Sequence, residues 1–340
     1  MPLRSRLLQS QFKPGLTLSL SSSSSSSSSS ILPLQLLLPQ QQQQQQPRVS
    51  AHRLHTTMAG EASATAAGAA AASKTPNNDG MREVRILMLH GYTQSGPLFH
   101  AKTRAVEKTL IKALAPLKVR PSLIYPTAPN RLSTRDIPGY SPTNAETADD
   151  SDAEMDAWAW FRKDEASGSY RLLEEGMQHI ATAVREDGGG AVDGVVGFSQ
   201  GGAVAAMVAA ALEGERKAVI SSSLSASTEQ QQQQPAWLDA LRQANNGKSL
   251  KFAVVYSGFF APPADLQWLF EPKISTPTLH YIGSLDTVVE EGRSRALVAR
   301  CEEPLVVVHP GGHYVPVSKE WVMPLIGFVR ERCEDDADES

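Results

Sequence analysis

The sequence predicts an α/β fold in which a mainly parallel central sheet carries helices on both faces. Short, almost wholly apolar runs recur along the chain, as is typical of strands buried on both sides. They alternate with longer stretches whose apolar residues recur at helical spacing. About 260 residues remain after a low-complexity start, a length within the range of a single domain. We therefore expect one α/β domain preceded by an extension.

Six apolar runs are the expected strands of this sheet. They cover residues 84–91, 119–129, 191–199, 250–259, 276–284 and 303–312. The clearest helical patterns cover residues 101–114, 169–186, 201–215 and 318–333. A parallel sheet places its working residues in the loops at the carboxyl ends of its strands, so the candidate residues are sought there.

The first 80 residues have the composition of a disordered extension. They include a serine run at 21–30, a glutamine run at 40–46 and a stretch of small residues at 60–72. These segments hold too few apolar side chains to offset the entropy of ordering them. Residues 1–60 carry five cations and no acid, which is typical of a mitochondrial transit peptide. A start of translation at Met58, with a weakly constrained extension before it, fits this pattern equally well. We expect a cytoplasmic protein, with a nuclear fraction also compatible, and mitochondrial import through the extension is the alternative.

The remaining composition excludes several classes of protein. With a net charge of −4 overall and +5 in residues 1–60, the rest of the chain carries −9 and has no basic stripe, which argues against nucleic acid as a partner. The two cysteines, Cys301 and Cys333, provide neither a disulfide framework nor a zinc cluster, which fits an intracellular protein. No phosphate-binding loop, metal-ligand spacing or dinucleotide fingerprint occurs, so we expect no cofactor, no metal and no membrane span. The oligomeric state is not predicted.

Three segments depart from the alternation of strands and helices. Residues 130–156 are rich in Pro, Asp, Ser and Thr, and we expect a long loop over the edge of the sheet. Residues 221–249 contain a glutamine run and are predicted as a low-complexity insertion on the surface. We expect the α/β domain to span residues 81–333 and an acidic tail to follow it at residues 334–340.

A serine lies between two glycines at the end of the third apolar run. The sequence Gly197-Phe-Ser199-Gln-Gly201 matches Gly-x-Ser-x-Gly, the sharp strand-to-helix turn that exposes a nucleophilic serine. Short matches arise by chance, but this one has the required apolar strand before it and a helix of small residues after it. We therefore interpret Ser199 as a nucleophile rather than as part of an ordinary turn.

A serine hydroxyl needs a base, and the base needs an orienting acid. In this type of site the chain order is Ser, acid, His, so the base is sought among three downstream histidines. His280 lies inside a predicted strand and is interpreted as a core residue, whereas His309 and His313 follow the last strand. Two glycines before His313 allow the bend toward the serine, and it is the favoured base. Asp286, after the preceding strand, is the favoured acid, with Asp265 as the alternative.

Hydrolysis also needs donors for the oxyanion of the tetrahedral intermediate. One is the backbone amide of Gln200, which follows the nucleophile. The other is expected from the loop after the first strand, most simply the amide of Tyr92. His90 in the same loop is interpreted as a bracing residue rather than as a base.

Three aromatic side chains follow the long loop: Trp158, Trp160 and Phe161. At their spacing they either line a pocket for the acyl group of a substrate or form the core face of a helix. The sequence does not decide between the two.

The stretches ILMLHGYTQSG, YPTAP, GFSQGGAVAA, VVYSGF, GSLDTVV and GGHYVP together resemble the FSH family of serine hydrolases, a group of α/β-hydrolases. The resemblance spans about residues 84–330. It implies an α/β-hydrolase fold, a Ser199–Asp286–His313 triad and hydrolysis of a small-molecule ester or acyl thioester, with secondary metabolism as one setting. The acyl-protein thioesterases and phospholipase-type carboxylesterases share GFSQGG and are the alternative. A ligand-binding scaffold without catalysis and a serine peptidase are the remaining hypotheses.

Overall fold

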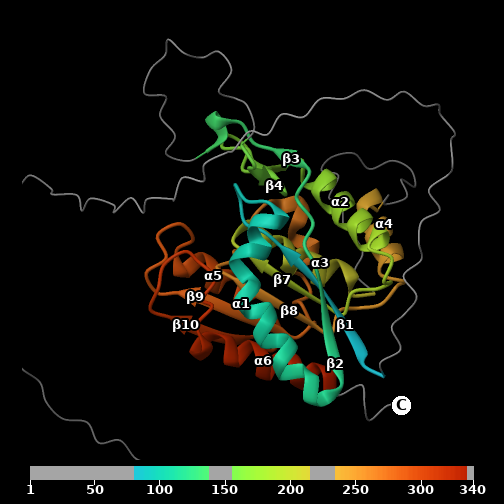
Figure 1. The fold of residues 1–340 in the computed structure, drawn as a ribbon. Coiled ribbons are helices and arrows are strands. Elements are labelled where there is room, and N and C mark those ends of the chain that lie inside the picture. Colours follow the sequence, from blue (N-terminus) through green and yellow to red (C-terminus); the bar gives the residue numbers. More distant parts are fainter. Residues whose placement is uncertain (1–79, 138–154, 215–233, 335–340) are drawn as a thin grey trace, which may run out of the picture. The chain divides into compact units, whose positions relative to one another are not determined.

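A computed structural model describes residues 80–137, 155–214 and 234–334, and these residues form the predicted α/β domain (Figure 1). Its centre is a six-stranded sheet in the order β10-β9-β8-β7-β1-β2, in which every pair of neighbours is parallel. The strands are β1 (Arg82–Leu89), β2 (Val119–Ile124), β7 (Gly194–Phe198), β8 (Phe252–Tyr256), β9 (Thr278–Gly283) and β10 (Leu305–His309). Each lies within or overlaps one of the six predicted runs, so the predicted fold class is confirmed.

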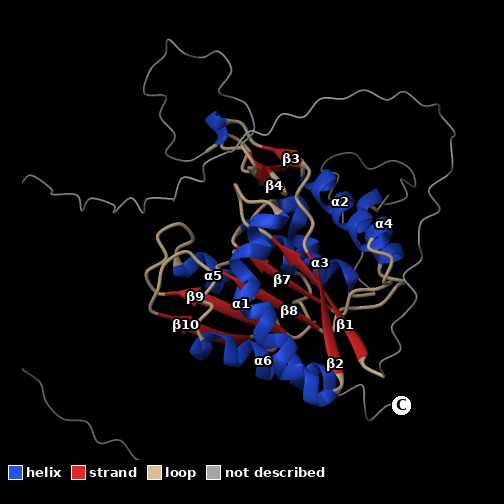
Figure 2. Cartoon of the chain, in the orientation of Figure 1, coloured by secondary structure: helices blue, strands red, loops and turns tan. Residues whose placement is uncertain are grey.

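The helices follow the strands in the chain, as Figure 2 shows. They are α1 (Gly96–Leu114), α2 (Leu173–Glu186), α3 (Gln200–Leu212), α4 (Ala236–Ala244), α5 (Glu291–Val298) and α6 (Lys319–Glu334). The short strands β3 (Asn130–Arg131) and β4 (Trp158–Ala159) pair with each other, as do β5 (Arg162–Lys163) and β6 (Tyr170–Arg171). In the part of the chain that the structure describes, three 3₁₀ turns complete the elements: η1 (Ala115–Leu117), η2 (Thr134–Asp136) and η3 (Ala264–Leu269).

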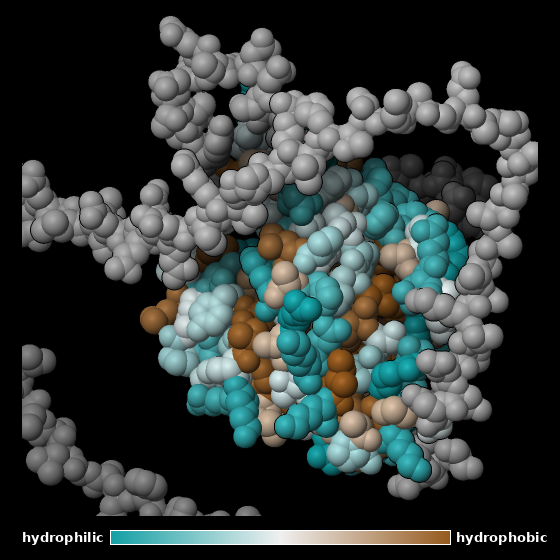
Figure 3. Space-filling model, viewed as in Figure 1, coloured by the Kyte–Doolittle hydropathy of each residue, from teal (hydrophilic) through white to brown (hydrophobic). Residues whose placement is uncertain are grey.

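The alternation of side chains along each strand divides the core into two layers. Ile86 and Met88 of β1 pack on one face with α1 and α6, whereas Leu87 and Leu89 pack on the other with α2, α3 and α4. Successive residues of a strand point to opposite faces, so an apolar run feeds both layers at once. Mostly hydrophilic side chains lie over the outward side of α1, and apolar ones show between the elements (Figure 3). Helices therefore cover both faces of the sheet, and its strand-end loops are left to form a site.

Four of the predicted segments fall wholly or partly outside the described residues. The N-terminal extension lies there up to residue 79, as do residues 138–154 of the long loop and residues 335–340 of the acidic tail. The predicted insertion at 221–249 lies outside only up to residue 233. Beyond that point the structure differs from the prediction, because the chain forms α4 and buries Trp237, Leu238 and Leu241 against the core. The amphipathic pattern of α4 is short and directly follows the glutamine run, so the low-complexity composition dominated the prediction.

The described residues can also be compared with the requirements of a membrane-spanning helix and of a metal site. Among the helices of the described ranges, none combines the length and the apolar character that crossing a bilayer requires. The same ranges contain no group of three or more His, Cys, Asp or Glu side chains arranged to hold a metal ion.

Candidate active site

Ser199 occupies the turn between β7 and α3 in a backbone conformation that side chains rarely adopt. Its φ is 55° and its ψ is −116°, and its amide donates to the carbonyl of Tyr256 over 2.8 Å. The flanking glycines make this turn possible. A Cβ on Gly197 would lie 2.1 Å from the oxygen of Gly201, and a Cβ on Gly201 would lie 2.2 Å from the oxygen of Leu89. The strand and the helix approach so closely that only glycine fits at both positions.

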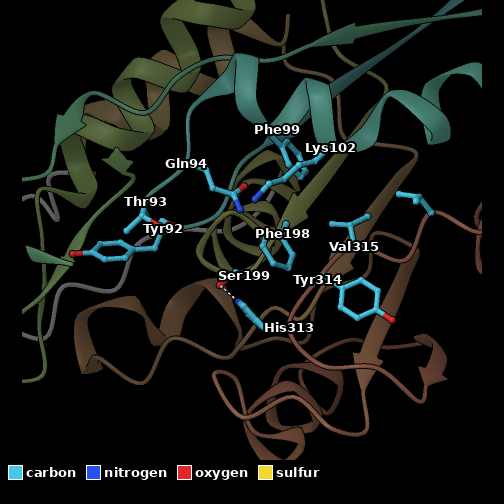
Figure 4. A pocket seen from close by; sticks show the side chains of 11 residues that line it. Tyr92, Thr93, Gln94, Phe99, Lys102, Phe198, Ser199, His313, Tyr314 and Val315 are labelled. Atoms are coloured by element: carbon cyan, nitrogen blue, oxygen red, sulfur yellow. Dashed lines mark hydrogen bonds between the residues drawn. The ribbon is translucent and has the colours of Figure 1, made fainter. Parts of the chain in front are cut away.

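A chain of hydrogen bonds connects Ser199 to a histidine and an aspartate. The Nε2 atom of His313 lies 2.9 Å from Ser199 Oγ (Figure 4). Its Nδ1 atom lies 2.8 Å from Asp286 Oδ2. The three residues follow β7, β9 and β10, so they come from three strand ends at one edge of the sheet. The structure therefore brings together the three residues favoured from the sequence.

Asp286 is held so that it can only accept hydrogen bonds. Its Oδ1 atom accepts from the amides of Val288 and Val289, each over 2.9 Å, while Oδ2 faces His313. Only 2% of its side-chain surface is exposed. Burial acts to raise the pKa of Asp286, but the bonds from His313 and the Val289 amide outweigh it and lower that pKa below its usual value. The carboxylate is thus ionised when it meets the imidazole.

The other candidates for the acid and the base do not lie beside Ser199. Asp265 is in η3, where it lines a second cavity and makes no described bond to His313. His280 is buried within β9 beside Cys301, and burial lowers its pKa to about 4. His309 ends β10 and is also buried; its Nδ1 atom accepts from the amide of Gly311 over 3.2 Å. These side chains are not placed to exchange a proton with Ser199.

His90 braces the loop after β1. Its Nδ1 atom lies 2.8 Å from the carbonyl of Gly91, and its Nε2 atom accepts from the amide of Ala128 over 2.9 Å. Burial lowers the pKa of His90 to about 4, so the ring is neutral with its proton on Nδ1. The ring therefore ties this loop to the segment after β2, in agreement with the predicted bracing role.

The two backbone amides expected to hold an oxyanion are free to donate to a ligand. Within the described ranges, neither the Tyr92 amide nor the Gln200 amide donates to a protein acceptor. Gln200 is the first residue of α3, so the positive end of the helix dipole lies beside Ser199 Oγ. Tyr92 lines the same cavity as Ser199.

A cavity of about 360 Å³ opens in front of the serine and histidine. It is lined by Tyr92, Thr93, Gln94, Phe99, Lys102, Phe198, Ser199, His313, Tyr314, Val315 and Val317 (Figure 4). Of the two alternatives for residues 158–161, the structure does not show the aromatic pocket, because Trp160 and Phe161 are buried in the core and Trp158 is not part of the lining. Nor do they form a helix: Trp158 is in β4, and Trp160 and Phe161 lie between β4 and β5. Phe99, Phe198 and Tyr314 provide the aromatic wall instead.

Trp160 and Phe161 have a different role, which the sequence did not reveal. The Gln200 side chain accepts from the Trp160 amide over 2.7 Å and donates to the Phe161 carbonyl over 2.9 Å. The indole of Trp160 in turn donates to the carbonyl of His90 over 2.9 Å. The residue after the serine thus fixes the segment that supports the loop after β1. The one sequence signal for this role was the polar side chain of Gln200, which stands between Ser199 and a helix of small residues.

The fold and this site define an α/β-hydrolase with a serine at its nucleophile turn. The chain matches the family described as "Serine hydrolase (FSH1)" over residues 81–325. It belongs to that family, as the resemblance in the sequence implied.

Relatives of known name support the same family. "Family of serine hydrolases 2" of Saccharomyces cerevisiae is 31% identical over 249 residues, which cover 72% of this chain and 94% of the relative. "Esterase OVCA2" of Xenopus tropicalis is 30% identical over 256 residues, 72% of this chain and 92% of the relative. A Schizosaccharomyces pombe protein named "Dihydrofolate reductase" is 30% identical over 236 residues, which cover 69% of this chain but only 44% of that relative.

Among solved structures, acyl-protein thioesterase 2 of Zea mays aligns with 75% of this chain and 95% of its own. The sequence identity is 20% and the TM-score is 0.44. No conclusion about activity follows from a likeness of that size.

Proposed function

We propose that the protein hydrolyses carboxylic esters or thioesters of small acyl compounds through an acyl-enzyme intermediate. The observation that carries this proposal is the bonded chain Ser199–His313–Asp286, which opens onto a cavity with an apolar wall. Membership of a serine hydrolase family and a relative named as an esterase support it.

In the proposed first half-reaction, Ser199 Oγ attacks the carbonyl carbon of the substrate while His313 Nε2 takes the hydroxyl proton. Asp286 accepts from Nδ1–H, which holds the ring in the required tautomer and stabilises the imidazolium. The amides of Tyr92 and Gln200 hold the negative oxygen, and each such donor is worth about 3–4 kcal/mol of transition-state stabilisation. The alcohol or thiol then leaves with the proton from Nε2, and the serine ester remains.

In the proposed second half-reaction, His313 takes a proton from water, and the resulting hydroxide attacks the acyl carbon. Collapse of the intermediate breaks the bond to Ser199 Oγ, which regains its proton from Nε2. The carboxylic acid then leaves the cavity. Every proton passes through one imidazole nitrogen, so no cofactor is required.

Covalent labelling tests this proposal directly. A fluorophosphonate should add once to the folded wild type and not at all to Ser199→Ala, as read from the intact mass. Ser275→Ala is the matched control, because this exposed serine lies away from the cavity and its loss should leave the adduct in place. Absence of an adduct on folded wild type would contradict catalysis and favour a ligand-binding scaffold.

A substrate panel then separates the classes of acyl bond. Aryl esters, acyl thioesters and peptides of matched acyl length should be compared on wild type and Ser199→Ala. We expect Ser199-dependent turnover of esters or thioesters and none of peptides. Cleavage of peptides alone would contradict the proposed class.

A further inference from the structure

Two side chains face the cavity in front of Ser199 with hydrogen-bond donors that no acceptor of the described residues takes up. The donors are the amide group of Gln94, in the loop after β1, and the ammonium group of Lys102, in the second turn of α1. Figure 4 shows both side chains directed toward the cavity, with their polar ends pointing toward each other. Neither residue takes part in the serine–histidine–aspartate chain.

The orientation of Gln94 follows from its surroundings. The residue is 8% exposed, and its Oε1 atom accepts from the amide of Gly91 over 3.4 Å. Only the oxygen of a side-chain amide accepts, so the NH₂ end is the one left for the cavity. No acceptor within the described ranges takes a hydrogen bond from it. A buried polar side chain with an unused donor at a cavity wall is suited to a ligand that accepts.

Lys102 has no counter-ion in the part of the chain that the structure describes. It forms no ion pair or hydrogen bond there, and the one acid on α1, Glu107, is bonded to His100 over 2.9 Å. None of the residues that line the cavity is an acid. The carboxylate of the serine–histidine–aspartate chain, Asp286, lies behind His313 and is bonded to it. Lys102, which is itself exposed, is therefore the one lining residue of this cavity with a permanent charge.

We propose that Gln94 and Lys102 form a subsite for a carboxylate, and that the substrate is an ester or thioester which carries one. Two donors, one of them charged, match the two oxygens of a carboxylate, while the apolar wall of Phe99, Phe198 and Val315 takes the carbon chain between that group and the reacting carbonyl. The inference rests on the proposed hydrolase activity and names its substrate class.

The test compares charged and neutral esters of matched size. On the acyl side, the 4-nitrophenyl half-ester of glutaric acid is compared with 4-nitrophenyl hexanoate. On the leaving side, 4-(butanoyloxy)benzoate is compared with its methyl ester. For each pair, kcat/KM is measured on wild type, on Lys102→Met and on Lys108→Met. Lys108 is the matched control, because it is an exposed lysine on the same helix that does not line the cavity.

In at least one pair, wild type should prefer the carboxylate ester by roughly 10- to 100-fold, the range expected for hydrogen bonds to a charged group. Lys102→Met should bring the ratio close to one, mainly through KM, while Lys108→Met keeps it. The preference of wild type should weaken as salt is added. The pair that responds tells whether the carboxylate belongs to the acyl part or to the leaving part.

The two proposals fail in different ways. Turnover of neutral esters without a charge preference in either pair, or a preference that Lys102→Met retains, would overturn the carboxylate subsite alone. Absence of both turnover and a fluorophosphonate adduct on wild type would overturn the hydrolase and this substrate class together. The charge preference is also measured on wild type alone. The proposal can therefore be overturned even if the Lys102 variant does not fold.

Discussion

Two cavities of similar size lie among the strand-end loops, and their chemistry is opposite. The cavity in front of Ser199 has a volume of about 360 Å³, and Lys102 is its only lining residue with a permanent charge. A second cavity, of about 380 Å³, is lined by Tyr170, Leu172, Leu173, Glu174, Glu175, Pro235, Trp237, Asp265, Leu266 and Trp268. It has three carboxylates and two indoles but no serine, histidine or lysine. The size of a cavity therefore does not single out the candidate site; the hydrogen bond between Ser199 and His313 in the first cavity does.

The comparison also explains why only one of two candidate acids meets the histidine. Asp265 follows β8 by several residues and is carried by η3 into the wall of the second cavity. Asp286 follows β9 within a tight turn, where the Val288 and Val289 amides fix it facing His313. Both positions fit the chain order. The short turn after β9 is what keeps the carboxylate next to the end of β10.

The largest expected effect concerns the proposed catalytic pair in the first cavity. Ser199→Ala and His313→Ala should each lower kcat by about 10⁴- to 10⁶-fold, and the double variant should be no worse because the residues act as a unit. Asp265→Asn in the second cavity should leave kcat within about twofold. Ester turnover by the purified variants is the measurement. Strictly additive losses in the double variant would contradict a shared mechanism.

The next effect is that of the acid. Asp286→Asn should lower kcat by about 10³- to 10⁴-fold, because an amide does not hold His313 in the same tautomer. The variant should still take up fluorophosphonate slowly at Ser199. If Asp286→Asn were near wild type while Asp265→Asn was inactive, the assignment of the acid would be reversed.

A third effect concerns the backbone beneath the first cavity. Gly201→Ala should lower the free energy of unfolding by about 2–4 kcal/mol, because its Cβ would lie 2.2 Å from the carbonyl oxygen of Leu89. Gly327→Ala in α6 is the control, since no atom lies within 4 Å of its added Cβ. That control should be neutral or stabilising by up to about 1 kcal/mol. Urea unfolding of both variants at pH 7 measures the difference.

The smallest effect is a dependence of stability on pH. Burial lowers the pKa of His90 and of His280 to about 4, so the unfolded chain binds protons that the folded chain refuses. Their stabilising contribution is complete above about pH 6.5 and is lost as pH falls toward 4. Between pH 7 and pH 5 each histidine should cost about 2 kcal/mol.

Urea unfolding at several pH values tests this, with His280→Asn beside wild type. The variant should show a shallower dependence on pH even if it is less stable at pH 7. An unchanged slope would mean that His280 takes up its proton without unfolding.

The sequence predicted the sheet and the serine–histidine–aspartate set because both follow from local patterns. Strands buried on both faces read as continuous apolar runs, and the glycines around Ser199 permit few alternatives. The lining of the cavity was not predictable in the same way. In Ala157-Trp-Ala-Trp160-Phe161 the alternation does not tell which face meets the core, and the bonds from Gln200 to this segment arise only in the fold.

Lys102 and Gln94 were missed for a related reason. On α1, Lys102 is one of several cations on the outward side of an amphipathic pattern, and only the course of the loop after β1 brings it to the cavity wall. α4 was missed because nine helical residues follow a glutamine run that dominates the composition. Interactions between elements far apart in sequence decided all of these features.

The left-handed backbone at Ser199 also implies a trade-off between stability and activity. A side chain held at φ 55° raises the free energy of the folded state by about 1–3 kcal/mol, whereas glycine would adopt that conformation with little strain. Selection for thermal stability alone would therefore favour glycine at this position. The serine is retained only where selection acts on turnover, so its presence in a variant library reports function rather than robustness.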